Sequence, residues 1–219
     1  MADYNTHTYF GMRVLEQLPT DLRRQMTRDL PAFRLGLYGP DPLIFLPWTK
    51  REACRYHQVW RQEGLPRLTR AMEGENPTQA SFAAGCILHL MLDDVVHPWI
   101  KSWIKEGSSH FRLELGLDRL IVQEQGLDHL PRLVTKGKDR TAQAAAELLP
   151  NTQAENFLWG LRNMDVSVAY LRRWGESHEK RITETEHSQI RFLRVSLEEA
   201  IRPTSAYLEE LLEPAPAGV

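Results

Sequence analysis

The chain has 219 residues, enough to bury a hydrophobic core unaided, and its two cysteines cannot form a disulfide framework. Its 27 basic and 29 acidic residues leave a formal net charge of -2, which excludes the global positive charge used in non-specific duplex binding. The N-terminus has neither the basic start nor the apolar core of a signal peptide, and no apolar run reaches membrane-spanning length. We therefore expect a cytoplasmic protein with no membrane span.

Apolar residues recur at helical spacing throughout the chain, and no set of alternating strand-like runs is present, so we predict an all-α protein. Pro31 should end or bend the second helix, and the run from Leu37 to Pro42 has the composition of a turn. Pro77 suits the first turn of a helix. The helices of the first half are expected at about residues 8–17, 20–30, 50–60 and 77–96.

In the second half, Pro98 should kink or weaken the preceding helix, and the next helix should start near residue 110. Residues 124–139 are expected to form a loop. Asn151 or Thr152 should cap a long helix that Gly175 ends, and Pro203 should break the helix that follows. We predict a single-domain multi-helix bundle over residues 1–213 and a disordered tail over residues 214–219.

Histidine and aspartate residues interrupt the apolar segment at residues 82–92 and the residues directly after it. His89 lies inside this segment, and Asp93 and His97 follow it. Residues four apart on a helix share one face, so these three side chains should form a single stripe. A buried carboxylate without a partner costs several kcal/mol, and a bound cation is one way of recovering that cost.

His110 and Glu114 repeat the same spacing on the next predicted helix. A mixture of imidazole and carboxylate ligands suits zinc at a hydrolytic site better than a structural thiolate site. The alternative is that each histidine is an ordinary core or surface residue. The two stripes favour metal binding, with the metal cluster held between helices.

A second metal hypothesis uses the two cysteines. Cys54 and His57 are three residues apart, as are Cys86 and His89, so the four could form a Cys2His2 structural zinc site. This hypothesis leaves the acids and the remaining histidines of the two stripes unexplained. Cysteines in apolar helices also occur as small buried hydrophobic residues, so we favour the hydrolytic site.

The ordered ligand types resemble the bacterial zinc-dependent phospholipase C family, whose superfamily also contains single-strand-specific zinc nucleases. Family members carry His-x-x-x-Asp followed by a His and then His-x-x-x-Glu. An earlier acid after a turn, a His beyond it and an N-terminal His complete the pattern. The resemblance runs from His7 to about Asp118. The matching residues here are His7, Asp41, His57, His89, Asp93, His97, His110 and Glu114.

The resemblance implies a zinc ion held by Asp41 and His57 together with His89 and Asp93. It also implies that Asp93 bridges to a second ion at His7, and that His97, His110 and Glu114 hold a further one. Secreted members use the amino group of a processed N-terminal Trp as a ligand, and this chain begins Met-Ala. We therefore expect two zinc ions and leave the third, at His7, open.

The resemblance implies a zinc-dependent hydrolase that cleaves a phosphate ester, most simply a small-molecule or lipid phosphodiester, by a metal-activated water. Asp41 could act as the catalytic base that orients this water. Single-stranded nucleic acid or a nucleotide is an alternative substrate. A non-catalytic, metal-stabilised helical binding module is the alternative from another class.

Further residues flank these candidates. Asp94 and Asp118 could hydrogen-bond the ligating histidines, or could simply be solvated acids. Four aromatic residues could wall an apolar slot for an acyl chain or a base, or could belong to the core. These are Phe45, Trp48, Trp99 and Trp103.

Overall fold

The computed structural model describes residues 4–127, 132–133 and 135–212, and these residues form helices and connections without a β-strand. The predicted all-α class is confirmed. The helices are α1 (Tyr4–Gln17), α2 (Thr20–Met26), α3 (Leu30–Gly36), α4 (Lys50–Val59), α5 (Leu65–Glu73), α6 (Pro77–Lys105), α7 (His110–Glu124), α8 (Lys138–Leu148), α9 (Ala154–Glu179) and α10 (Glu184–Leu212), with a 3-10 turn η1 (Asp41–Phe45) and a π-helical turn η2 (Trp60–Gly64).

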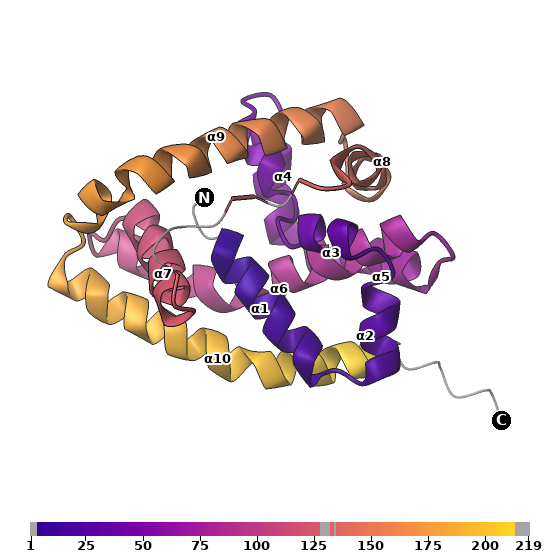
Figure 1. Ribbon diagram of the computed structural model, residues 1–219, viewed down its shortest axis with the longest axis horizontal. Helices are drawn as coiled ribbons and strands as arrows, with labels where there is room; N and C mark the ends of the chain where they lie inside the picture. The colour runs from indigo at the N-terminus through magenta and orange to yellow at the C-terminus, as the bar shows by residue number, and fades with distance from the viewer. Residues whose placement is uncertain (1–3, 128–131, 134, 213–219) are drawn as a thin grey trace.

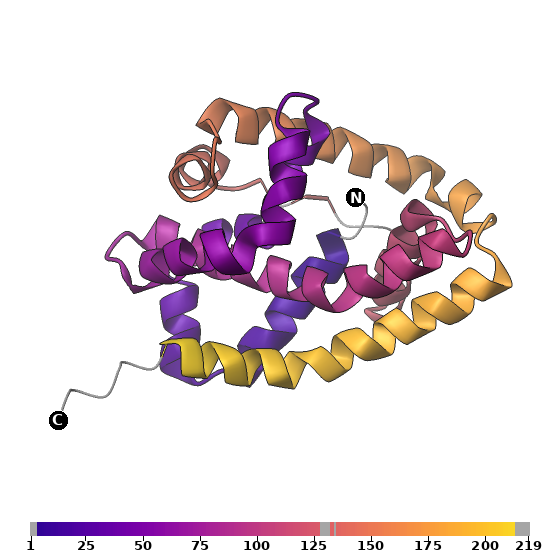
Figure 2. The same ribbon diagram turned by 180° about the vertical axis from the view of Figure 1, so that it is seen from behind.

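Helix α6 runs through the middle of the fold and contacts α1, α2, α3, α5, α7, α8 and α10, while α9 and α10 lie on opposite sides of it (Figures 1 and 2). Contrary to our expectation from the sequence, α6 is long and apolar enough to cross a membrane by length and composition alone. However, 83% of its most apolar window is buried inside the fold. A buried core helix meets the same criterion, so α6 is the central core helix.

Helices α3 and α6 cross at close range in the core. A Cβ atom on Gly36 would lie 2.3 Å from the carbonyl oxygen of Phe82, and one on Gly85 would lie 2.2 Å from that of Phe33. Because both glycines lack a side chain, the two backbones approach each other directly. This crossing positions the end of α3 and the turn after it against the part of α6 that carries His89.

Two predictions about prolines, those for Pro31 and Pro203, were wrong, and α6 extends beyond the end near residue 96 that we expected before Pro98. Pro31 lies in the first turn of α3, where Asp29 caps the helix by accepting a hydrogen bond from the Ala32 amide. Pro98 and Pro203 lie inside α6 and α10, which continue past them. A proline in a helix removes one backbone hydrogen bond, and tertiary packing of the following turns can hold the helix together despite that loss.

The second half differs from the prediction at several boundaries. Helix α8 was not predicted, and α9 begins at Ala154 without a side-chain cap. Asn151 has a left-handed backbone (φ 52°), and Thr152 donates to the Pro150 carbonyl, so neither residue caps α9. Helix α9 also continues through Gly175 to residue 179. The predicted tail at residues 214–219 and part of the predicted loop lie outside the described residues.

Candidate metal centre

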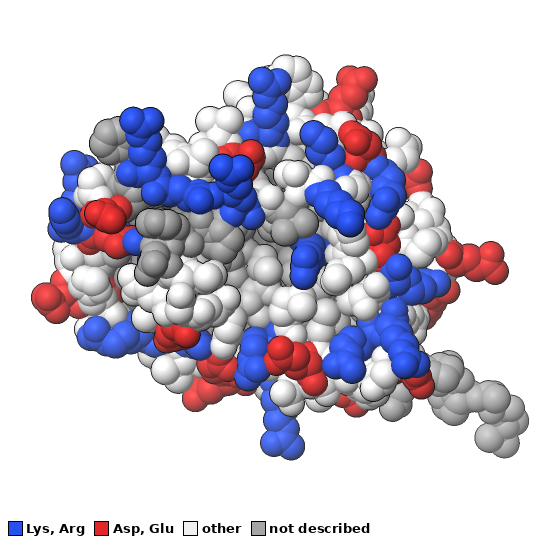
Figure 3. Space-filling view, in the orientation of Figure 1, with Lys and Arg blue, Asp and Glu red and all other residues white. Residues whose placement is uncertain are grey.

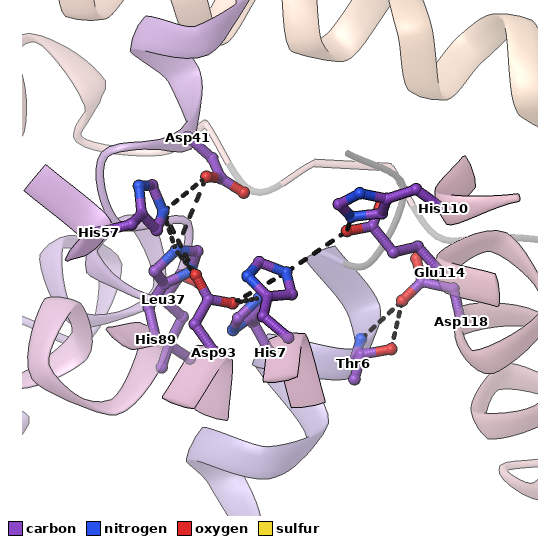
Figure 4. Close-up of polar contacts among 11 residues, drawn as sticks. Thr6, His7, Leu37, Asp41, His57, His89, Asp93, His110, Glu114 and Asp118 are labelled. Carbon is purple, nitrogen blue, oxygen red and sulfur yellow. Dashed lines mark hydrogen bonds and ion pairs between the residues drawn. The ribbon is translucent and has the colours of Figure 1, made fainter. Parts of the chain in front are cut away.

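All eight candidate ligands lie close together in one cluster that reaches the surface at His110, although they come from five different elements. Figure 4 shows seven of them by label. α1, η1 and α4 contribute one each, α6 contributes three and α7 contributes two. They form three groups in which the potential ligand atoms are all within 4.8 Å of one another. The groups are His7, His89 and Asp93; Asp41, His57 and His89; and His97, His110 and Glu114.

The group at Asp41 and His57 has the dimensions of a tetrahedral zinc site. Four ligand atoms placed 2.0–2.1 Å from a tetrahedral ion are about 3.3–3.4 Å from one another. Here the His57 Nε2 atom lies 3.1 Å from Asp41 Oδ1, 3.2 Å from His89 Nε2 and 3.3 Å from Asp93 Oδ2. The His89 Nε2 atom lies 3.7 Å from Asp41 Oδ1 and 3.5 Å from Asp93 Oδ2. These four side chains could therefore hold one zinc ion.

Backbone carbonyls orient the two histidines of this group. His57 Nδ1 lies 2.7 Å from the Ala53 oxygen, and His89 Nδ1 lies 3.1 Å from the Leu37 oxygen. A carbonyl oxygen can only accept, so each Nδ1 carries the proton and donates it. In a neutral ring the Nε2 lone pair then points toward the carboxylates, as a metal ligand requires.

Asp93 lies between the groups and is buried (Figure 4). Its Oδ2 atom faces His57 and His89, while its Oδ1 atom lies 3.4 Å from His7 Nε2 and 3.6 Å from His97 Nε2. Neither oxygen has a hydrogen-bond partner among the described residues. A buried carboxylate surrounded by imidazole nitrogens at these distances fits a cation on each side.

The third group lies at the open end of the cluster. The Glu114 Oε1 atom is 2.5 Å from His110 Nε2 and 3.5 Å from His97 Nε2. The Glu114 side chain is buried, whereas that of His110 is 45% exposed. This group could hold a metal through three side chains and leave a position open toward solvent, the arrangement found in catalytic zinc sites.

The histidine pKa values reflect a site that attracts positive charge. Burial, followed by neighbouring His7, lowers the pKa of His89 to about 4 despite the opposing effect of Asp93 and Asp41, so the ring is neutral at neutral pH. Burial also acts to lower the pKa of His57, but the hydrogen bond to Asp41 and the charge of Asp93 outweigh it and raise that pKa to about 9. The acids around His57 therefore favour a cation, either a proton or a metal ion.

Asp118 has a role that sequence reasoning missed. This fully buried carboxylate accepts hydrogen bonds from the Thr6 amide (2.8 Å), the Thr6 hydroxyl (2.6 Å) and the Asn5 side-chain amide (3.0 Å). It therefore fixes the first turn of α1, which carries His7 (Figure 4). Asp94, by contrast, accepts from Trp60 and Arg61 and not from a histidine.

The Cys2His2 hypothesis was wrong. Cys54 is exposed and Cys86 is buried, and none of the three groups in the described chain contains a cysteine. Of the four flanking aromatic residues, Trp48 is 67% exposed and Trp99 is 46% exposed, so these two do not belong to the core. These two aromatic rings lie at the surface.

The family comparison agrees with this geometry. Residues 6–180 match the family model described as zinc dependent phospholipase C, a range that includes all eight candidate ligands. The match extends beyond the first half and includes α8 and α9, so the resemblance is longer than the sequence motifs indicated. No curated protein and no solved structure matches the chain. The chain belongs to the zinc-dependent phospholipase C family, a family of zinc-dependent phosphoric diester hydrolases.

Proposed function

We propose that the protein hydrolyses a phospholipid phosphodiester at a zinc cluster held by the eight residues of the metal centre. The observation that carries this proposal is the buried carboxylate of Asp93, which has imidazole nitrogens of different groups around its two oxygens. A structural site for a single ion would not need a shared acid. A cluster of neighbouring ions suits a phosphodiester, whose charge and leaving oxygen both need stabilisation.

Asp41, His57, His89 and Asp93 are the proposed ligands of one ion. Three side chains at the open end, His97, His110 and Glu114, are the proposed ligands of another. His7 and the Oδ1 atom of Asp93 form part of a third site. Two ions are proposed as the minimum. His89 and Asp93 are already proposed as ligands of the first ion, so His7 is the one member of its group that belongs to neither of the other two sites.

When bound, zinc lowers the pKa of an attacking water and offsets charge on the phosphoryl oxygens. The chain supplies the rest of the site. Burial raises the pKa values of Asp41 and Asp93, but hydrogen bonds and electrostatic attraction from the surrounding histidine side chains outweigh it and keep both pKa values low. Asp41 lies at the edge of the cluster with 14% of its side chain exposed, and it is the proposed base that orients the water.

The exposure of His110 supports catalysis over a non-catalytic, metal-stabilised module. A purely structural site is closed by protein ligands, whereas this end of the cluster is accessible. Single-stranded nucleic acid and nucleotides share the phosphodiester chemistry. They remain alternative substrates that the assay must separate from phospholipid.

The test measures metal content and hydrolysis in protein purified without chelator. We expect at least two zinc ions per chain, cleavage of an activated aryl phosphodiester, and faster cleavage of a dispersed phospholipid than of a single-stranded oligonucleotide. Asp93→Asn should lower the rate at least about a hundredfold, because it removes charge from two groups at once. Asp94→Asn, one residue away but outside the cluster, is the matched control.

Absence of bound zinc, or equal phosphodiesterase rates for wild type and Asp93→Asn, would overturn the proposal. Preferential cleavage of the oligonucleotide would instead assign the nuclease activity. Bound zinc without hydrolysis of any of the three substrates would favour the binding module.

A further inference from the structure

Helix α9 presents a line of large apolar side chains to solvent. Trp159 is 55% exposed, Val166 is 64% exposed and Tyr170 is 53% exposed. They are seven and four residues apart, a spacing that places them along one side of a helix. The opposite side of α9 is buried in the core through Phe157 and Leu161, so α9 has two apolar sides and only one of them is covered.

Basic side chains accompany this line. The Arg162 guanidinium lies over the ring of Trp159, 5.7 Å from its centroid. Lys and Arg side chains gather over α9 and the adjoining chain (Figure 3). The line is therefore both aromatic and cationic, although the whole chain has a formal net charge of -2.

Two cavities beside the line add more positive charge. One of about 440 Å³ is lined by Arg132, Arg172 and Arg173, and a second of about 320 Å³ is lined by Lys138 and Arg162. The acid Asp165 lines both, so the cavities adjoin along α9. Five cations around one acid leave an excess of positive charge, and cavities of this size could accept phosphate groups.

Three of these five cations form no ion pair among the residues that the structure describes. Arg132, Arg162 and Arg172 each lack a carboxylate within ion-pair distance among the residues that the structure describes. Elsewhere on the surface, arginines such as Arg112 and Arg194 are paired with glutamates. Arginines without an ion-pair partner beside exposed aromatic rings complement a lipid bilayer, which has anionic headgroups at its surface and apolar acyl chains below them.

Helix α9 also lies beside the metal centre. It packs against η1 so closely that a Cβ atom on Gly160 would lie 2.0 Å from the Pro42 carbonyl oxygen. Pro42 directly follows Asp41, so this stretch of α9 packs against the turn that carries one of the candidate ligands. A partner bound to α9 would therefore lie near the metal centre.

We propose that this surface, formed by Trp159, Arg162, Val166, Tyr170 and Arg172, docks the protein on a bilayer that contains anionic phospholipids. The aromatic rings insert at the level of the headgroups, and the arginines bind lipid phosphates. This proposal rests on the proposed function, because docking would serve to bring a phospholipid substrate to the metal centre. Binding itself can be measured without catalysis.

The test is co-sedimentation of the full-length protein with vesicles of phosphatidylcholine alone or mixed with phosphatidylglycerol. We expect binding to the mixed vesicles that weakens as salt is raised. Trp159→Ala with Tyr170→Ala should reduce it about tenfold or more, and Arg162→Gln with Arg172→Gln by a similar factor. Both double variants should retain wild-type hydrolysis of a water-soluble aryl phosphodiester.

The matched controls alter exposed aromatic and basic side chains elsewhere on the molecule. Trp99→Ala with Phe192→Ala and Arg191→Gln with Arg202→Gln should bind mixed vesicles like wild type. Equal loss in the controls, or no loss in the α9 variants, would overturn the docking surface. Equal binding to phosphatidylcholine vesicles and to the mixed vesicles would also overturn it. A wild type that binds mixed vesicles but cleaves no phosphodiester would contradict the proposed function and leave the docking surface supported.

Discussion

At the scale of single residues, Asp118 shows how a side chain outside the three groups can control one of them. It accepts hydrogen bonds from the Thr6 amide and hydroxyl, and so holds the first turn of α1 that carries His7. Asp118→Ala would leave buried donors without an acceptor. We expect a loss of about 3 kcal/mol in the free energy of unfolding, measured by urea denaturation.

The same variant should lower zinc binding at His7 selectively, so that metal analysis finds at most one ion fewer per chain. Asp21→Ala, which removes an exposed acid from α2, should change neither quantity. Loss of all bound zinc in Asp118→Ala, with the fold intact by circular dichroism, would contradict this assignment.

Gly39 is a second residue whose effect reaches the metal centre. Its φ of +53° is left-handed, and a Cβ atom there would lie 2.3 Å from Cδ2 of the His89 ring. Gly39→Ala should displace the ring, reduce zinc content by at least one ion and lower the hydrolysis rate about tenfold or more. Gly126→Ala imposes a similar backbone strain (φ +71°) where no atom lies within 4 Å, so it should keep wild-type zinc content.

At the scale of helices, the crossing of α3 and α6 depends on Gly85. An alanine Cβ would meet the backbone of α3 at Phe33 and that of Leu37 directly after it, and a backbone cannot move aside as a side-chain end can. Despite the better helix propensity of alanine, Gly85→Ala should destabilise the protein by about 2–3 kcal/mol in thermal or urea denaturation. Gly116→Ala meets only the flexible ends of Ile182 and Ile190, and its effect should stay within about 1 kcal/mol.

The start of α10 is joined to the start of α7 through Glu186. Burial raises the pKa of this carboxyl, but hydrogen bonds from Arg112 and from the Ser109 and Thr183 amides outweigh it and hold the pKa at about 2. Because the folded-state pKa is below the usual value of 4.5, Glu186 stabilises the fold fully above about pH 4.5, and this contribution is lost as the pH falls toward 2.

We therefore expect wild type to lose about 2 kcal/mol more unfolding free energy than Glu186→Gln between pH 6 and pH 3. The measurement is urea denaturation with a chelator present throughout, so that zinc release does not contribute. Glu184→Gln, an acid in the same first turn, should follow wild type. A wild-type acid loss no larger than that of Glu186→Gln would show that these hydrogen bonds do not stabilise the ionised form.

At the scale of the whole molecule, the metal centre connects α1, η1, α4, α6 and α7. Ions that bind only the folded chain stabilise it by about 4 kcal/mol at a thousandfold excess over the dissociation constant. For a chain of this length we therefore expect removal of zinc by a chelator to lower the melting temperature by about 10 °C or more. Re-addition of zinc should restore it, whereas Asp93→Asn should respond much less.

The ligand types and their local spacing could be predicted from the sequence because they depend on helix geometry alone. His89, Asp93 and His97 are one turn apart on α6, and His110 and Glu114 are one turn apart on α7. The positions of Asp41 and His57 followed from the family resemblance, since their spacing to α6 is not local. Helix ends were predicted less well at Pro98, Pro203 and Gly175, where packing outweighs the local preference of the residue.

By itself the sequence determined an all-helical chain with a set of imidazole and carboxylate ligands, because helical periodicity and residue chemistry are local properties. Only the tertiary structure decided which of these ligand types lie within a few ångströms of one another, since the separations around Asp93 depend on how five elements pack. It also decided that Asp118 supports α1 and that Trp159, Val166 and Tyr170 face solvent. An apolar residue on a helix is buried only where a neighbour covers it, and that neighbour comes from a distant part of the chain.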